Sequence, residues 1–99
     1  MSRDGILVLV CNINLRKKLL LGKVQVATRG FILVNENEEL IKQIENKASE
    51  VIIKELKNKK FNYNELKNVL ITEVNAFVLD KTGRKPIILP VIMDIKTNE

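Results

Sequence analysis

The feature that most constrains this 99-residue chain is that its apolar residues change their spacing twice along the sequence. Residues 6–34 carry short aliphatic runs, residues 40–78 repeat apolar side chains every three or four positions, and residues 87–95 return to an aliphatic run. A spacing of three and four places side chains on one face of a helix, whereas β-branched runs favour strands. The chain therefore predicts strands, then helices, then a last strand.

The first part of the chain predicts a hairpin and a further strand. Ile6–Ile13 is an aliphatic run, which predicts a strand buried on both faces. Asn14–Lys18 is largely polar and basic, as is typical of a hairpin turn. Leu19–Lys23 is a weaker strand because it contains Gly22, and Val24–Val34 is expected to form the next strand.

Two amphipathic helices are expected in the middle of the chain. The first begins at Asn35, whose side chain can cap the helix, and a glutamate three residues later can return a bond to the cap. The second begins near Asn62 or Asn64. If Asn62 is the cap, Phe61 and Leu66 occupy the positions of a hydrophobic staple.

Four residues are predicted to shape the backbone. Gly30 interrupts the alternation of its strand, which indicates a bulge or the close approach of another backbone. Gly83 can end the second helix in a left-handed conformation. Pro86 leads into the last strand, Ile87–Ile95, and Pro90 lies within it. Since proline cannot donate to a ladder, this strand is expected at an edge or with a bulge.

These elements predict an α/β fold, an α+β two-layer sandwich in a single domain over residues 1–99. A small three- to four-stranded mixed sheet carries two amphipathic helices on one face, in the order β-(β)-β-α-α-β. The other face of the sheet, if it is apolar, should be covered by a partner.

The side chains needed for catalysis or metal binding are scarce. The chain has no histidine, the commonest general base and metal ligand, and one cysteine, Cys11, within an apolar run. Cys11 is interpreted as a small buried hydrophobe, and a chain without a disulfide fits a reducing cytoplasm. No segment approaches the roughly 20 apolar residues that cross a bilayer. We expect no catalytic residue, no metal ligand and no cofactor in this chain, and no membrane association.

The net charge of +5 suggests attraction to polyanions such as RNA. The candidate phosphate contacts are Arg16, Lys17, Lys18, Arg29, Arg84 and Lys85. Two other interpretations stay open: these charges are simply solvated, or the Lys-rich composition reflects the base composition of a genome. The shortage of aromatic residues argues against a reader of single-stranded RNA bases.

Several stretches resemble the ribonuclease J family. Thr28–Val34 (TRGFILV) is similar to the family's SRGFVYV, and Thr82–Ile95 (TGRKPIILPVIMDI) is similar to its closing TKRRPMILPIIMEV. Shorter matches at corresponding spacings lie at Asp4–Val8, Glu38–Ile41 and Glu65–Asn68. The resemblance covers nearly the whole chain and is confined to the small C-terminal domain of that family.

The resemblance implies that the parent protein is a metal-dependent ribonuclease, acting within RNA, from its 5′ end, or both. Its core would be a metallo-β-lactamase domain with an inserted β-CASP domain. The zinc ligands and catalytic motifs of the family lie in those upstream domains, so no catalytic residue carries over. The chain departs from the family pattern at Leu33, Asn35 and Gly83.

The leading hypothesis is a non-catalytic C-terminal domain in the cytoplasm that supports oligomerisation and nuclease activity. It would pack against its own upstream catalytic domains or a second copy. The candidate interface residues are Phe31, Leu33, Ile88 and Val91, for each of which burial in the core is the competing interpretation. The alternative function is direct RNA binding. A free-standing enzyme is disfavoured because no nucleophile–base pair is present.

Overall fold

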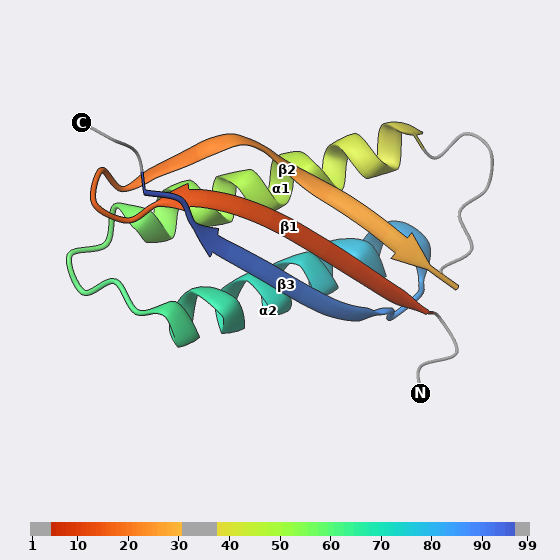
Figure 1. The fold of residues 1–99 in the computed structure, drawn as a ribbon. Coiled ribbons are helices and arrows are strands. Elements are labelled where there is room, and N and C mark those ends of the chain that lie inside the picture. The colour runs from red at the N-terminus through yellow and green to blue at the C-terminus, as the bar shows by residue number, and fades with distance from the viewer. Residues whose placement is uncertain (1–4, 31–37, 97–99) are drawn as a thin grey trace.

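A computed structural model describes residues 5–30 and 38–96. The elements in this part of the chain are strand β1 (Ile6–Asn14), strand β2 (Leu19–Arg29), helix α1 (Glu38–Leu56), helix α2 (Tyr63–Thr82) and strand β3 (Ile87–Asp94). The strands form one sheet in the order β2-β1-β3, and both helices cover the same face of it (Figure 1). The predicted two-layer α/β fold is confirmed, with three strands among these residues.

The central strand β1 runs antiparallel to β2 and parallel to β3. Opposite Cys11, β2 holds residues 22–24 in a bulge that adds two residues to the strand. Because two is an even number, side chains on both sides of the bulge keep pointing to the same faces of the sheet. The prediction of separate strands at Leu19–Lys23 and Val24–Val34 is therefore wrong. One strand runs through the glycine and ends at Arg29.

The core lies between the sheet and the helices. The β1 side chains that point to the helices have no exposed surface: Leu7, Leu9, Cys11 and Ile13. The helices bury Ile44, Ala48 and Ile52 of α1 and Leu66, Leu70 and Val74 of α2 against them. The intervening residues Ile6, Val8 and Val10 are only partly buried. The expectation that this strand is buried on both faces is wrong, because one helical layer covers one face only.

Both ends of α2 are fixed as the sequence predicts. The Asn62 side chain accepts hydrogen bonds from the backbone N–H groups of Asn64 at 2.8 Å and Glu65 at 3.3 Å. Gly83 ends the helix with φ 72°, and its N–H donates to the Leu79 carbonyl at 2.8 Å. Few side chains tolerate this φ, so glycine is the favoured residue there.

The other backbone predictions have mixed outcomes. Gly30 follows β2 with φ 70°, and a Cβ atom there would lie 3.5 Å from the Gly5 Cα atom, an ordinary contact. The positive φ, rather than a close approach of backbone, therefore favours glycine at this position. Pro86 is buried directly before β3. The predicted cap Asn35 lies outside the described residues.

Pro90 lies in an edge strand, as predicted. Two backbone bonds fix its orientation: the Ile87 N–H donates to the Gly5 carbonyl, and the Ile95 N–H donates to the Ile13 carbonyl. Because backbone groups alternate along a strand, odd-numbered residues of β3 donate toward β1, and Pro90 faces the free edge. Proline at this position removes a backbone N–H group that would point away from the sheet, and no hydrogen bond to β1 is lost. The free edge of β3 is therefore less able to pair with another strand.

Candidate docking face of the sheet

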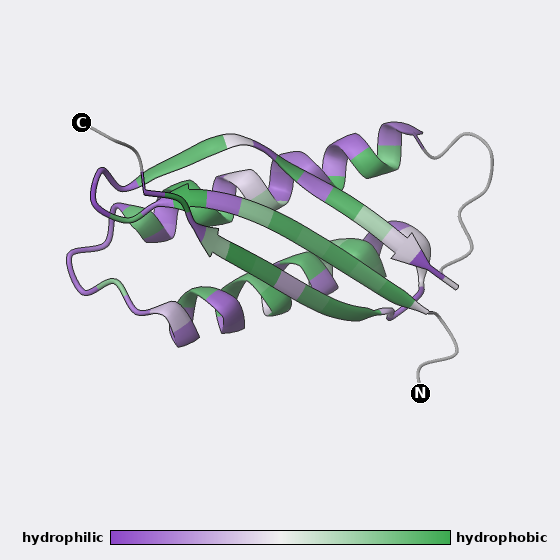
Figure 2. Ribbon diagram, viewed as in Figure 1, coloured by the Kyte–Doolittle hydropathy of each residue, from purple (hydrophilic) through white to green (hydrophobic). Residues whose placement is uncertain are grey.

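The face of the sheet opposite the helices is mostly apolar along β1 and β3, and most residues of these two strands are hydrophobic (Figure 2). The odd-numbered side chains of β3 are large and exposed: Ile87 at 40%, Leu89 at 44%, Val91 at 42% and Met93 at 42%. Ile95 directly after the strand, Leu19 of β2 and the half-buried Ile6, Val8 and Val10 of β1 extend this surface. We call these residues the open face.

The open face follows from the sequence of β3. Side chains alternate between the two sides of a strand, so Ile88 and Ile92 point to the helices while their neighbours point away. A strand with a solvated side normally places polar residues at alternate positions. Here the outward set, Ile87, Leu89, Val91 and Met93, is wholly aliphatic or thioether, and the inward set contributes Ile88 and Ile92 to the core. The strand therefore has the composition of one that is covered on both sides.

The size of the open face is that of a functional patch. Two strands spaced about 4.8 Å apart over about eight residues, together with Leu19 and Ile95 at their ends, span roughly 300 Å². The largest apolar patch on a typical monomer is about 300–600 Å² and is often an interaction site. The open face is thus large enough to be a docking surface.

The structure separates the four residues predicted for an interface. Val91 lies on the open face, whereas Ile88 is 6% exposed and belongs to the core. Phe31 and Leu33 lie outside the described residues. Sequence reasoning missed Leu89 and Met93, although the alternation along β3 was the signal that could have found them.

The six predicted phosphate contacts fall into two groups. Arg16, Lys17 and Lys18 form the tip of the β1–β2 hairpin. Arg29, Arg84 and Lys85 gather at the opposite end of the molecule, which is 43 Å long, since Arg29 and Ile87 both flank Ile6 in the sheet (Figure 1). These residues therefore do not form one continuous site.

The remaining chemistry of the described residues is sparse. The Cys11 side chain is fully buried, and burial raises the pKa of its thiol to about 11, so the reactive thiolate is disfavoured at neutral pH. Within residues 5–30 and 38–96, no group of three histidine, cysteine, aspartate or glutamate side chains is placed to hold a metal ion. Neither of the two described helices is long and apolar enough to span a bilayer.

The sequence of this chain is similar to those of known proteins. The family described as "Ribonuclease J C-terminal domain" matches residues 1–95. Ribonuclease J2 of Bacillus subtilis is 34% identical over 95 residues, which are 96% of this chain and 17% of that protein. Ribonuclease J 2 proteins of Staphylococcus epidermidis and Streptococcus pyogenes are each 28% identical, over 96% and 97% of this chain and 17% of their own length. The chain thus spans about a sixth of these relatives.

Proposed function

Since this chain belongs to the ribonuclease J C-terminal domain family, we propose that it is the accessory domain of an RNA-degrading metalloenzyme and holds copies of that enzyme together. The hydrolytic chemistry, with its zinc ions, belongs to the upstream catalytic domains, to which this domain is joined in a cytoplasmic parent protein. The chain itself takes no part in bond cleavage. The scarcity of nucleophiles and general bases in its sequence supports that division of labour.

The observation that carries the proposal is the open face, and its proposed occupant is the open face of a second copy. At the centre of the face, Val8 lies beside Leu89 and Val10 lies beside Val91. A two-fold axis brings the same residues of both copies together, and aliphatic side chains meet their own kind without repulsion between like charges. Two sheets packed in this way interdigitate at about 10 Å.

The small area of the open face limits the strength of the contact between two copies. Roughly 300 Å² of sheet per copy is less than half of the ~800 Å² per partner in a standard stable interface. The isolated chain should therefore associate weakly and in a concentration-dependent way. In the parent protein, contacts outside this chain would add to the open face and make the assembly stable.

Sedimentation equilibrium of the 99-residue chain over a wide concentration range tests the proposal. Leu89 and Ile53 are both 44% exposed, but Leu89 lies on the open face and Ile53 on α1. Leu89→Lys should weaken the dimer at least ~30-fold, because half of a leucine's burial is worth about 1 kcal/mol and is lost in both copies. Ile53→Lys is the matched control and should leave the dimer unchanged.

Two outcomes would contradict the proposal. A chain that stays monomeric at millimolar concentration does not bind itself through the open face, and the catalytic domains would then be the better candidate for the occupant. Equal weakening by Leu89→Lys and Ile53→Lys would place the contact elsewhere or assign it to the added charge.

A further inference from the structure

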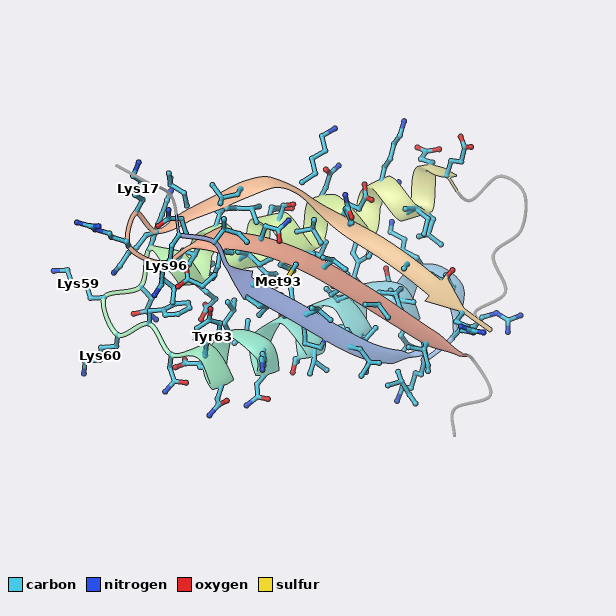
Figure 3. All side chains as sticks on the ribbon, viewed as in Figure 1. Lys17, Lys59, Lys60, Tyr63, Met93 and Lys96 are labelled. Atoms are coloured by element: carbon cyan, nitrogen blue, oxygen red, sulfur yellow. The ribbon has the colours of Figure 1, made fainter. Side chains whose placement is uncertain are left out.

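One end of the molecule gathers basic side chains from three segments that are far apart in the sequence. They come from the β1–β2 hairpin tip (Arg16, Lys17, Lys18), from the connection between α1 and α2 (Lys57, Lys59, Lys60) and from Lys96 after β3. Figure 3 shows Lys17, Lys59, Lys60 and Lys96 at this end. We call these seven residues the basic end.

Asp94 links the segments that carry the basic end. Its Oδ1 atom accepts a hydrogen bond from the Leu15 N–H at 3.1 Å, which ties the hairpin tip to the end of β3. Tyr63 at the start of α2 lies within electrostatic range of the same carboxylate: burial first, and then Asp94, raises the pKa of its hydroxyl. The Asp94 carboxylate therefore ties the hairpin tip to the end of β3, and the first turn of α2 lies close enough to interact with it electrostatically.

The cations are presented on short, hydrogen-bonded turns. In the hairpin tip, the Lys17 N–H donates to the side chain of Asn14, which is only 4% exposed, at 3.0 Å. In the connection between the helices, the Lys60 N–H donates to the Asn58 side chain at 3.0 Å. Fixing the backbone in this way lowers the entropy that the lysines lose when they bind a common partner.

The balance of charge at the basic end points to a polyanion. Besides the seven cations of the basic end, this end of the described chain carries Lys54 and three carboxylates, Glu55, Glu65 and Asp94, and the Asp94 carboxylate already accepts a backbone hydrogen bond. Cations held close together repel one another, and a ligand with regularly spaced negative charges relieves that repulsion. A single carboxylate or phosphate would engage only part of the set.

We propose that the basic end binds the sugar–phosphate backbone of single-stranded RNA. The choice of RNA among polyanions rests on the proposed function, while the charge and geometry stand without it. The two aromatic residues near this end, Phe61 and Tyr63, pack edge to face with ring centroids 5.7 Å apart and are partly buried against the core. Because the two rings pack against each other and against the core, binding should follow phosphates and not sequence.

This site differs from the one that the sequence suggested. Arg16, Lys17 and Lys18 keep their predicted role, but their partners are the interhelix lysines and Lys96 in place of the cations at the opposite end. The basic end also lies at the tip of the sheet, beside the open face. The two surfaces share no residue, so the proposal allows RNA and a second copy of the chain to be bound at the same time.

Fluorescence anisotropy with labelled 15-nucleotide poly(U) and poly(A) tests the inference on the 99-residue chain. If four lysines contact phosphates, the logarithm of affinity falls with the logarithm of salt concentration with a slope of about −2.8. Affinity should then drop roughly 50-fold between 50 and 200 mM salt. The two RNAs should bind alike, because bases are not read.

A pair of double variants locates the site. Lys59→Ala with Lys60→Ala should weaken binding to both RNAs and reduce the salt slope by about 1.4. Arg29→Ala with Lys42→Ala removes the same charge from exposed positions at the other end and should leave the slope nearly unchanged. Equal losses in the two double variants would mean that net charge alone attracts RNA, which overturns the inference.

Further outcomes separate this inference from the proposed function. No RNA binding at 50 mM salt in a chain that still dimerises overturns the basic end alone. RNA binding by a chain that never dimerises overturns the open face alone. A tenfold preference between the two RNAs would contradict phosphate-only contact. Competition by polyglutamate as strong as that by RNA would assign the basic end to acidic protein segments instead.

Discussion

Cys11 provides a quantitative test of the core. Its side chain has no exposed surface and lies in the central strand, and burial raises the pKa of its thiol from 9.0 to about 11. An unfolded chain loses the thiol proton near pH 9, whereas the folded chain keeps it until near pH 11. The stability that the neutral thiol contributes is therefore complete below pH 9 and is lost as pH rises from 9 to 11.

The size of the loss follows from the two pKa values. At pH 10 the free energy of unfolding should be about 1.4 kcal/mol lower than at neutral pH. Above pH 11 this loss approaches about 2.7 kcal/mol. Urea unfolding at pH 7.5 and pH 10, followed by circular dichroism in the presence of a reductant, measures this difference. Both values are large beside the total stability of a small domain, about 5–15 kcal/mol.

Cys11→Ala supplies the control for this measurement. The variant should be less stable than the parent chain at pH 7.5, because the smaller side chain leaves a small cavity. Its further loss between pH 7.5 and pH 10 should be about 1.4 kcal/mol smaller, since Tyr63 and the lysines titrate alike in both chains. An equal loss in both chains would refute the reasoning and would indicate that the thiol is reached by water.

Two further predictions concern α2 and its surroundings. Asn62→Ala should lower the free energy of unfolding by about 1 kcal/mol, because two backbone N–H groups lose their acceptor. The control Asn64→Ala should change it by less than about 0.5 kcal/mol. Urea unfolding of both variants measures the difference. Tyr63 is the only tyrosine and the chain has no tryptophan, so its hydroxyl can be titrated by ultraviolet absorbance. Its midpoint should lie above 10.0, and Asp94→Asn should lower it without restoring 10.0, because burial is the larger cause of the shift. A midpoint that Asp94→Asn leaves unchanged would separate Tyr63 from Asp94 and weaken the case that these segments meet at the basic end.

The helices could be predicted closely because their signals are local. The spacing of apolar residues sets the face of each helix, and Asn62 and Gly83 act through backbone groups two to four residues away. Strand boundaries were harder to predict. Gly22 gives the same signal whether a strand ends or bulges, and only the register against β1 decides between them.

Burial of the sheet could not be predicted from β1 alone. An aliphatic run such as Ile6–Ile13 is equally suited to a strand between two helical layers and to a strand with one face left uncovered by its own domain. The single helical layer of the described residues, and not the composition of the strand, leaves Val8 and Val10 partly exposed. The same uncertainty applied to Ile88 and Val91, three residues apart, of which the register with β1 buries one and exposes the other.

The basic end was hidden from sequence reasoning for a different reason. Lys57, Lys59 and Lys60 follow α1, where cations complement the helix dipole, so their positions in the sequence have a local explanation. Only the fold brings them to the same end as the hairpin tip and Lys96, which are at least 36 residues away in sequence. Long-range gathering of like charges has no signature in spacing along the chain.

The two proposed surfaces depend on different physical forces, and this makes them separable in a single sample. Association through the open face buries aliphatic surface and should persist as salt is raised, whereas phosphate contacts at the basic end weaken steeply. Raising salt from 50 to 200 mM should therefore release RNA from a chain that remains self-associated. If both interactions weakened together, charge would be holding the copies together, for example with RNA bridging two basic ends. The open face would then lack the role that its aliphatic composition indicates.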